Sequence, residues 1–319
     1  MEGIDNLGAT CAINSLIQLI CRCEKIRNII LNTEIDNNTF TGELKEIIDL
    51  MYNKNKSLHP IKFINSFYKI FEGIFKRYEQ IDINELWLYV YQKINEETEI
   101  SKKKIEEIKN INDEHDYNID IYNNNKESNI MKIIQGSFIN IIQCCKCNNK
   151  TYKFEPFINI LLDIDIDDKD NNTIADLIIN YMKNEFREKD EWKCDKCNEN
   201  TSYIKTNRIW KLPKVLFISL NRFKDVYNKN NKEVYINDNI VFNKGSILNN
   251  DIDVKYNLQG LALHSGDLLG GHYTAICNMK NGYYNFYNDN QINIIKKEDL
   301  VSKMITNSVY LLVYEIDEN

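Results

Sequence analysis

Residues 6–20 read NLGATCAINSLIQLI, a single cysteine at the entry to a strongly apolar segment. Apolar residues recur at helical spacing from this point on, which predicts one helix over residues 10–32, with Thr10 as the cap of its first turn. Cys11 would then lie in that first turn. Unpaired backbone N–H groups and the positive end of the helix dipole favour a thiolate there, so Cys11 is the candidate nucleophile.

Two residues just before this cysteine suit a reaction at a carbonyl group. Gly8 leaves room for the close approach of a substrate backbone. The side-chain amide of Asn6 could donate to an oxyanion alongside the backbone N–H of Cys11.

The chain contains four histidines, and an activated thiol needs one of them as its base. His272 is preferred because the two glycines before it leave open space for a narrow substrate tail. A polar partner, Asn288 or Asp289, follows on the next predicted strand and would fix the tautomer of the imidazole. His264 then lines the wall of the site or has a structural role. Two further histidines are expected at the surface, His59 and His115. The residues together predict a cysteine protease.

Composition indicates an ordinary folded enzyme. The 319 residues are 43% hydrophobic and 11% aromatic, enough for a large buried core. The net charge of −7 offers no basic excess for a phosphate backbone, which argues against nucleic acid as a partner. We find neither a secretory signal in MEGIDNLGAT nor an apolar run long enough to span a bilayer, so we expect a soluble intracellular protein, cytoplasmic or nuclear, without a membrane partner.

The order of predicted elements indicates an α+β fold. Helices are expected early, over residues 42–53, 60–76 and 82–96 in addition to the first one. Residues 101–132 are rich in lysine, glutamate and asparagine and are interpreted as an exposed, mobile insertion. Strands are expected later, over residues 138–142, 157–166, 215–220 and 310–315.

Four cysteines form two C-x-x-C pairs, separated by residues 148–193: Cys144, Cys147, Cys194 and Cys197. Each pair can form a knuckle that presents two thiolates, and two knuckles complete the tetrahedral sulfur shell that zinc prefers. Such a closed site leaves no position for water, so the zinc would be structural. Cys145 is left outside this shell. Three other cysteines, Cys21, Cys23 and Cys277, are interpreted as small apolar packing residues.

Five motifs, in order, resemble the ubiquitin-specific protease family of papain-like deubiquitinases. Gly3 to Ser15 resembles its cysteine box and Leu263 to Asp289 its histidine box. Three linking motifs agree as well, at residues 79–86, at Gln135-Gly136 before the first cysteine pair, and from Leu212-Pro213 to Phe223. The resemblance covers nearly the whole chain, and an ordered set is more specific than any short match alone.

This resemblance implies a single catalytic domain with a helical thumb at about residues 1–132, zinc-stapled fingers at 133–212 and a palm at 213–319. It implies a monomer that hydrolyses the bond after the C-terminal glycine of ubiquitin. The catalytic positions would be Cys11, His272, Asn288, Asp289 and Asn6. The substrate contacts would be Asp82, His264, Gly270, Gly271 and Tyr273, with Asp82 meeting arginines of the ubiquitin tail.

The chain departs from the family pattern at several packing positions. Ala9 stands where asparagine is usual, Ala12 and Ile13 replace tyrosine and methionine, Ile81 replaces glutamine, and Tyr284 stands where tryptophan is common. None of these changes removes a reacting group. Three alternatives remain: a ubiquitin-binding module without catalysis, a protease for another ubiquitin-like modifier, and, least favoured by the acidic balance, a zinc-ribbon nucleic-acid binder.

Overall fold

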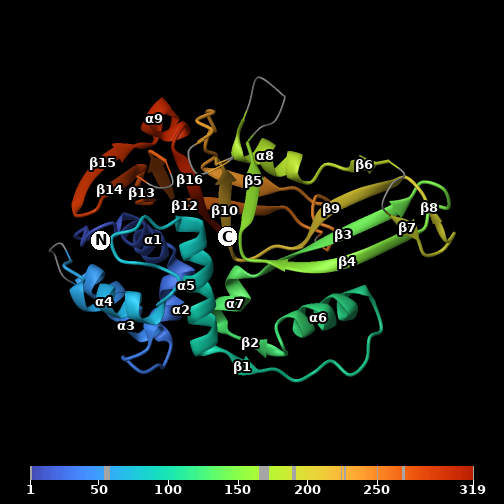
Figure 1. The fold of residues 1–319 in the computed structure, drawn as a ribbon, viewed down its shortest axis with the longest axis horizontal. Helices are drawn as coiled ribbons and strands as arrows, with labels where there is room; N and C mark the ends of the chain where they lie inside the picture. Colours follow the sequence, from blue (N-terminus) through green and yellow to red (C-terminus); the bar gives the residue numbers. More distant parts are fainter. Residues whose placement is uncertain are drawn as a thin grey trace.

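The computed structural model describes residues 2–53, 58–164, 172–188, 192–223, 225, 228–249, 251–267 and 270–318. A helical lobe, a large mixed sheet and a long narrow sheet that extends to one side make up the molecule (Figure 1). These parts are called the thumb, the palm and the fingers below. Helices dominate the first third of the chain and strands the remainder, which confirms the α+β prediction.

The thumb consists of helices α1 (Cys11–Arg22), α2 (Glu24–Asn32), α3 (Phe40–Asn53), α4 (Ile61–Ile70), α5 (Ile83–Thr98) and α7 (Asn129–Ile134). The predictions for α3 and α5 are confirmed to within two residues, whereas α4 ends six residues earlier than expected. The single helix expected over residues 10–32 is wrong, because Cys23 has extended backbone angles and separates α1 from α2. Its Sγ donates to Glu315 Oε2 at 3.0 Å, which holds this corner against the palm. None of the described helices has the length and apolar character needed to cross a bilayer.

The palm is an eight-stranded sheet. Its strands follow one another as β15 (Gln291–Lys296), β14 (Tyr283–Asn288), β13 (His272–Asn278), β12 (Val254–Ser265), β16 (Val309–Ile316), β10 (Val215–Asn221) and β5 (Ile160–Asp163), with β11 (Asn239–Phe242) also paired to β12. All these pairs are antiparallel except β10 with β5. The strands expected at 215–220 and 310–315 are confirmed. Of the strand expected over 157–166, residues 160–163 form β5, and residues 165 and 166 lie outside the described residues.

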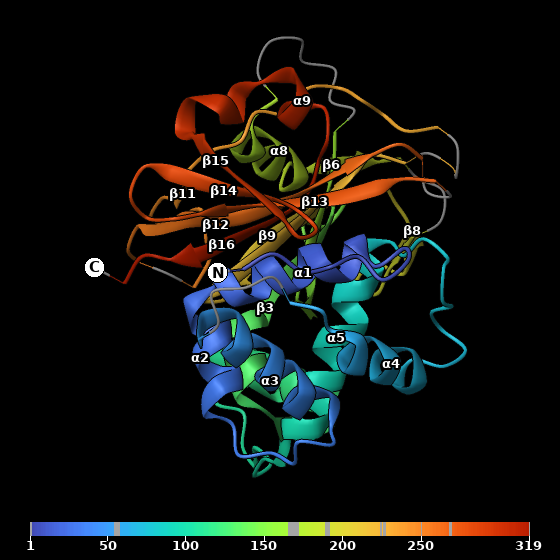
Figure 2. The same cartoon turned by 90° about the vertical axis from the view of Figure 1, so that its left-hand side faces the viewer.

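Helices cover both faces of the palm sheet. Helix α1 lies on one face, and α8 (Ile174–Tyr181), α9 (Lys303–Thr306) and the 3-10 helix η1 (Lys297–Val301) lie on the other (Figure 2). Every residue of α1 from Cys11 to Cys21 is buried, because the helix is enclosed between the sheet and the thumb helices. The rings of Trp87 on α5 and Phe217 on β10 stack at 3.9 Å and join the thumb to the palm.

The fingers are a four-stranded sheet whose far end carries a small hairpin. The sheet has the order β4 (Lys150–Phe157), β3 (Gly136–Cys144), β9 (Tyr203–Lys211), β6 (Glu185–Arg187), and the hairpin consists of β7 (Lys193–Cys194) and β8 (Glu199–Asn200). The strand expected at 138–142 is thus confirmed as part of β3.

The segment expected to be an exposed insertion is partly folded against the fingers. It contains α6 (Ile111–Tyr122) and a two-stranded pair of β1 (Ile100–Ser101) and β2 (Lys126–Glu127). The surface prediction for His115 is wrong, since this residue is only 4% exposed. Its Nε2 lies 2.8 Å from Ser137 Oγ, and its ring packs against Phe154 and Trp210. Ile119, one helical turn later, packs against the same cluster, so α6 has a buried face despite its polar composition.

Candidate active site

The start of α1 places Cys11 between thumb and palm. The residue is 1% exposed and lies in the first helical turn, as the sequence predicts. The Cys11 Sγ points toward Gln80 Oε1 at 3.9 Å, just before α5. Thr10 does not cap the helix. Its hydroxyl instead accepts from the N–H of Leu7 at 3.0 Å and donates to Asn6 Oδ1 at 3.2 Å, which tightens the loop before the cysteine.

His272 is the histidine that faces this thiol. It is the first residue of β13, and its Nε2 lies 2.8 Å from Oδ1 of Asn288, the last residue of the neighbouring strand β14. Nδ1 is then the ring nitrogen left for Cys11. Hydrogen bonding with Cys11, supported by the bond with Asn288, raises the pKa of His272 to about 9 against the opposing effect of burial. The imidazole therefore keeps its proton at neutral pH.

Asp289 lies beside this pair but binds other partners. Its Oδ2 accepts from Asn6 Nδ2 at 3.0 Å and its Oδ1 accepts from Asn14 Nδ2 at 2.8 Å. Asp289 has a left-handed backbone with φ of 53°, which turns its carboxylate away from the strand. The carboxylate thus joins the loop before Cys11 to the first turns of α1.

Both polar atoms of the Asn6 side-chain amide are hydrogen-bonded. Its Oδ1 accepts from the N–H groups of Gly8 and Thr10 at 3.0 and 3.2 Å, while its Nδ2 donates to Asp289. An amide nitrogen carries two hydrogens, so one remains for an oxyanion. Gly8 and Ala9 both have positive φ, 96° and 52°, and asparagine tolerates that conformation better than alanine does.

The side of Gly8 where a Cβ would lie is occupied by a residue that the sequence did not point to. A Cβ on Gly8 would lie 2.7 Å from the ring of Tyr78, which is 76% exposed. The space expected for a substrate backbone on this side of Gly8 is therefore taken up by an aromatic ring from the segment before α5.

Asp82 caps α5 at the entrance to the site. Its Oδ1 accepts from the N–H groups of Asn84 and Glu85 at 2.8 and 3.0 Å. Its Oδ2 accepts from the hydroxyls of Tyr310 at 2.6 Å and Tyr273 at 3.5 Å. Asp82 and Tyr273 are thus brought together as neighbours. Sequence reasoning missed Tyr310, which lies on the last strand without any motif around it.

His264 packs against Gly271, whereas His272 is the histidine that meets the thiol. His264 is 2% exposed, and a Cβ on Gly271 would lie 2.0 Å from its Nε2. Its ring is 4.5 Å from that of Tyr273. Burial lowers the pKa of His264 to about 4, so it is neutral at physiological pH. Gly270 is exposed and donates its N–H to Asp267 Oδ1 at 2.8 Å.

The two C-x-x-C pairs meet at the end of the fingers. Their four Sγ atoms lie within 4.8 Å of one another, and the Cys144–Cys197 and Cys147–Cys194 separations are 3.9 and 3.6 Å. Zinc–sulfur bonds of about 2.3 Å in a tetrahedron place the sulfur atoms about 3.8 Å apart, so the four thiols fit such an ion. Cys145 is exposed and outside this group.

The two knuckles have the same local geometry. Each is followed by an asparagine with a left-handed backbone, Asn148 with φ of 56° and Asn198 with φ of 57°. The N–H of that asparagine donates to the carbonyl of the first cysteine, at 3.0 Å from Asn148 to Cys144 and 2.7 Å from Asn198 to Cys194. Thr201 Oγ1 lies 3.2 Å from Cys144 Sγ and supports the first ligand.

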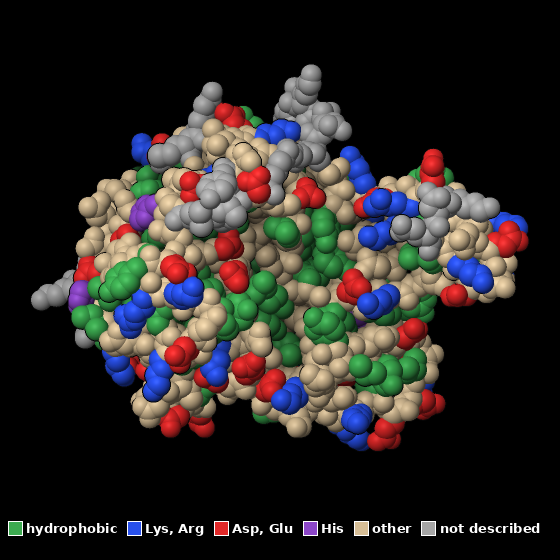
Figure 3. All heavy atoms as spheres, viewed as in Figure 1, with side chains coloured by type: hydrophobic (Ala, Val, Ile, Leu, Met, Phe, Trp, Pro, Cys, Tyr) green, Lys and Arg blue, Asp and Glu red, His purple; other side chains and the backbone are tan. Residues whose placement is uncertain are grey.

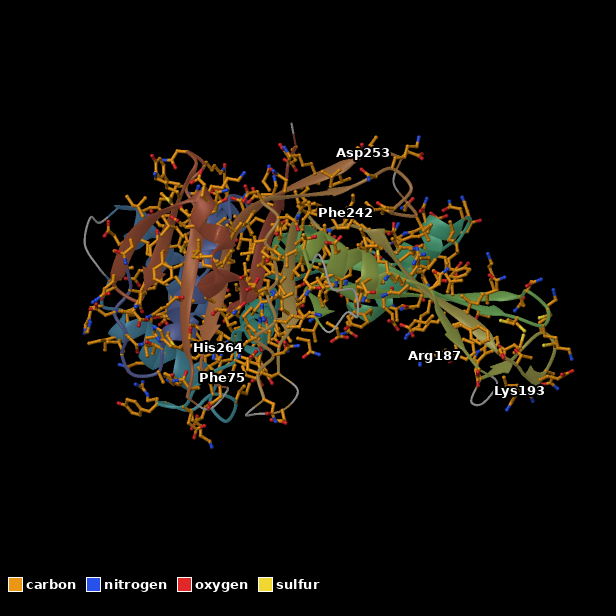
Figure 4. The ribbon with its side chains drawn as sticks, turned by 90° about the horizontal axis from the view of Figure 1, so that it is seen from above. Phe75, Arg187, Lys193, Phe242, Asp253 and His264 are labelled. Carbon is orange, nitrogen blue, oxygen red and sulfur yellow. The ribbon has the colours of Figure 1, made fainter. Side chains whose placement is uncertain are left out.

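A hollow separates the active-site end from the tip of the fingers. From above, Phe75 and His264 lie at one end and Arg187 and Lys193 at the other, with the fingers bent toward the same side (Figure 4). Hydrophobic side chains gather in the hollow between α5 and the base of the fingers (Figure 3). Leu88 on α5 and Leu161 on β5 are 44% and 51% exposed. A cavity of about 610 Å³ lies nearby, lined by α5 and by Pro156 to Ile158. Exposed apolar surface of this kind is typical of a protein-binding site.

In this site, a thiol at the start of a helix faces a histidine on the adjoining sheet, and an asparagine on the neighbouring strand of that sheet holds the histidine. This arrangement defines a papain-like cysteine protease. The family model described as "Ubiquitin carboxyl-terminal hydrolase" matches residues 2–314. The chain belongs to this family.

Individual relatives agree with this assignment. The chain is 25% identical to ubiquitin carboxyl-terminal hydrolase 8 of Saccharomyces cerevisiae, over 99% of this chain and 70% of the relative. It is 26% identical to ubiquitin carboxyl-terminal hydrolase 4 of Arabidopsis thaliana, over 98% of this chain and 92% of the relative. It spans 39% of the length of hydrolase 4 of S. cerevisiae, so some relatives are much longer.

Solved structures share the fold. The chain resembles Ubp8 in the SAGA DUB module bound to ubiquitin aldehyde, with a TM-score of 0.78, 24% identity, and coverage of 100% of this chain and 70% of the other. A second structure of the module, bound to monoubiquitin, gives a TM-score of 0.77 with 23% identity, over 100% of this chain and 69% of the other. The thumb, palm and fingers architecture is therefore shared over the whole chain.

Proposed function

We propose that this chain is a deubiquitinating enzyme that hydrolyses the isopeptide or peptide bond after the C-terminal glycine of ubiquitin. The observation that carries the proposal is the position of the buried Cys11 thiol beside the His272 imidazole, with Asn288 bound to the opposite ring nitrogen. Family membership and the ubiquitin-bound state of the structural neighbours support ubiquitin as the substrate. All three residues come from one chain, so a monomer suffices.

The reaction is acyl transfer in two steps. The Cys11 thiolate attacks the carbonyl carbon of the terminal glycine, and the oxyanion accepts hydrogen bonds from the backbone N–H of Cys11 and from Asn6. His272 gives its proton to the departing lysine amine, which leaves a thioester on Cys11. Water, deprotonated by the now neutral imidazole, hydrolyses the thioester and restores the thiolate and the protonated histidine.

The remaining residues of the site bind and orient the tail. Asp82 supplies a negative charge where the tail enters, and its contacts with Tyr273 and Tyr310 fix the direction of that charge. Gly270 and Gly271 form the wall of the channel, and His264 packs against Gly271 from beneath. The body of ubiquitin occupies the hollow, against apolar residues such as Leu88 and Leu161.

Zinc at the four cysteines would hold the fingertip together and take no part in the reaction. The boundaries we propose are about 1–132 for the thumb, 133–212 for the fingers and 213–319 for the palm. They are supported by α7 ending at Ile134, by the four-stranded sheet running from Gly136 to Lys211, and by β10 starting at Val215.

The function is tested with ubiquitin that carries a thiol-reactive group at its C-terminus. We expect a single covalent adduct, which peptide mass spectrometry locates at Cys11, and no adduct with His272→Ala. An adduct with another modifier but not with ubiquitin would reassign the substrate. Measurable ubiquitin binding with no adduct would identify a non-catalytic ubiquitin-binding protein instead.

The raised pKa of His272 predicts an alkaline limit to activity. The protonated imidazole is the form that serves the leaving amine, so kcat/KM for a ubiquitin amide substrate should fall as the pH rises through about 9. The same shift contributes folding stability that is complete below the unfolded-state pKa of about 6.5 and is lost as the pH rises through about 9. A kcat/KM profile that falls already at about pH 7 would contradict the coupling between His272 and Cys11.

A further inference from the structure

The residues just before Asn6 bridge thumb and palm. Asp5 donates its N–H to the carbonyl of Leu58 at 2.8 Å, and Leu58 donates to the carbonyl of Gly3 at 2.9 Å, next to α4 of the thumb. On the other side, Ile4 donates its N–H to the carbonyl of Asp289 at 3.0 Å, in the turn between β14 and β15. A Cβ on Gly3 would lie 2.5 Å from the carbonyl oxygen of Asn290, so the two segments are packed backbone to backbone.

The carboxylate of Asp5 joins the same two sides through its side chain. Its Oδ1 accepts from Asn290 Nδ2 at 2.7 Å, and its Oδ2 lies 2.8 Å from Nδ1 of His59, the residue after Leu58. The hydrogen bond from Asn290, followed by that from His59, lowers the pKa of Asp5, so the carboxylate is ionised at neutral pH. The group formed by Asp5, His59 and Asn290 is called the clasp below.

The clasp lies next to the candidate oxyanion donor Asn6 and next to Asp289, the residue that Asn6 binds. Asp5 precedes Asn6, and Asn290 follows Asp289, so the bonds Asp5–Asn290 and Asn6–Asp289 link the same two segments side by side. Asn14 of α1 adds a third connection, since its Nδ2 lies 3.3 and 3.4 Å from the carbonyls of Ile4 and Asp5. These contacts fix Asn6 relative to the helix that carries Cys11.

We infer that Asp5 is a positioning residue for the reaction, which acts by holding Asn6 where the oxyanion forms. The inference rests on the proposed function. An oxyanion donor contributes to rate only when it is already aimed at the position of the developing charge, and a shift of about 1 Å is enough to lose much of its effect. Among the described residues, no hydrogen bond or ion pair joins the side chains of the clasp to Cys11, Leu88 or Leu161, so we expect the effect of Asp5 in kcat and not in KM.

Asp5→Ala should lower kcat for hydrolysis of a ubiquitin fluorogenic amide about tenfold, with KM within about twofold of wild type. Asp5→Asn retains one acceptor oxygen for Asn290 or His59 and should recover most of the rate. Glu46→Ala is the matched control. It removes an exposed ion pair between Glu46 on α3 and Lys62 on α4, the helix that begins just after His59, and its kcat should equal that of wild type.

Two further readouts separate positioning from general damage. Alkylation of Cys11 by iodoacetamide needs the thiol–imidazole pair but no oxyanion donor, so its rate should be unchanged in Asp5→Ala. In an Asn6→Ala background, Asp5→Ala should cause little further loss, because the donor that it positions is gone.

Three results would overturn the positioning role of Asp5. An equal kcat for Asp5→Ala and wild type overturns the inference, as does slower alkylation or a full tenfold loss in the Asn6→Ala background. If the wild-type protein itself does not hydrolyse ubiquitin substrates, the proposed function is wrong. This result is distinct from a failure of the inference about Asp5, because it is seen without any variant.

Discussion

Replacement of Cys11 by alanine is expected to abolish hydrolysis of ubiquitin conjugates while ubiquitin binding is retained. Removal of a catalytic nucleophile costs roughly 10⁴- to 10⁶-fold in kcat, because the remaining groups cannot form the acyl intermediate. The substitution removes one sulfur atom from a buried position at the start of α1 and leaves Asp82 and the apolar hollow unchanged. The dissociation constant for ubiquitin should therefore stay within about threefold of wild type.

Cys145→Ala provides the matched control for this variant. Cys145 is an exposed cysteine at the far end of the fingers and outside the four-thiol cluster, so its removal should leave both turnover and binding unchanged. Turnover and binding are measured with a fluorogenic ubiquitin substrate and by calorimetry. Substantial residual turnover by Cys11→Ala would refute the nucleophile assignment, and lost binding together with lost turnover would show that the substitution damages the fold.

Loss of the metal from the fingers is expected to have the second largest effect. We expect one zinc ion per chain by elemental analysis, and loss of that ion in Cys194→Ser. Structural zinc sites supply on the order of 10 kcal/mol in small peptides, and the β7–β8 hairpin forms a separate two-stranded sheet that the four cysteines join to the end of β3. The fingertip should unfold without the ion, and the KM for ubiquitin should rise tenfold or more because one wall of the hollow is lost.

The effect of zinc loss should be confined to substrate binding. The alkylation rate of Cys11 by iodoacetamide should be unchanged in Cys194→Ser, since α1, which begins at Cys11, lies far from β7 and β8 at the fingertip (Figure 1). Cys145→Ser should keep the metal. A wild-type protein that binds no zinc, or a Cys194→Ser variant with normal KM, would contradict a structural role for the ion.

Much of the fold follows from local patterns. Helical spacing of apolar residues predicted α1, α3 and α5, and short apolar runs predicted β3, β10 and β16. The errors arose where a distant contact overrides the local pattern. The apolar pattern continues past Cys23, yet the chain turns there, and the thiol contacts a glutamate on the last strand. His115 lies in a polar segment, yet the fingers provide it with an aromatic pocket and a serine partner.

The groups that the structure brings together at the candidate sites were likewise predicted from the sequence, because a thiol, an imidazole and two cysteine pairs are recognisable by residue type and spacing alone. Their neighbours were not. Whether Asn288 or Asp289 binds the histidine depends on the left-handed turn at Asp289, which directs its carboxylate to Asn6 and Asn14. Tyr310 reaches Asp82 across 228 residues of sequence, and no local pattern encodes such a contact.

The sequence by itself therefore determined which chemical groups this protein can offer, namely a candidate nucleophile and base and four thiols that suit a metal, together with most of its main helices and strands. Those properties depend on residue type and on spacing within a few positions. Only the tertiary structure decided how the groups are aimed: the side of His272 that Asn288 occupies, the ring that borders Gly8, and the bonds of Asp5 that hold Asn6. Orientation depends on contacts between segments that meet only when thumb and palm close on α1, and their geometry is set by packing rather than by any single stretch of residues.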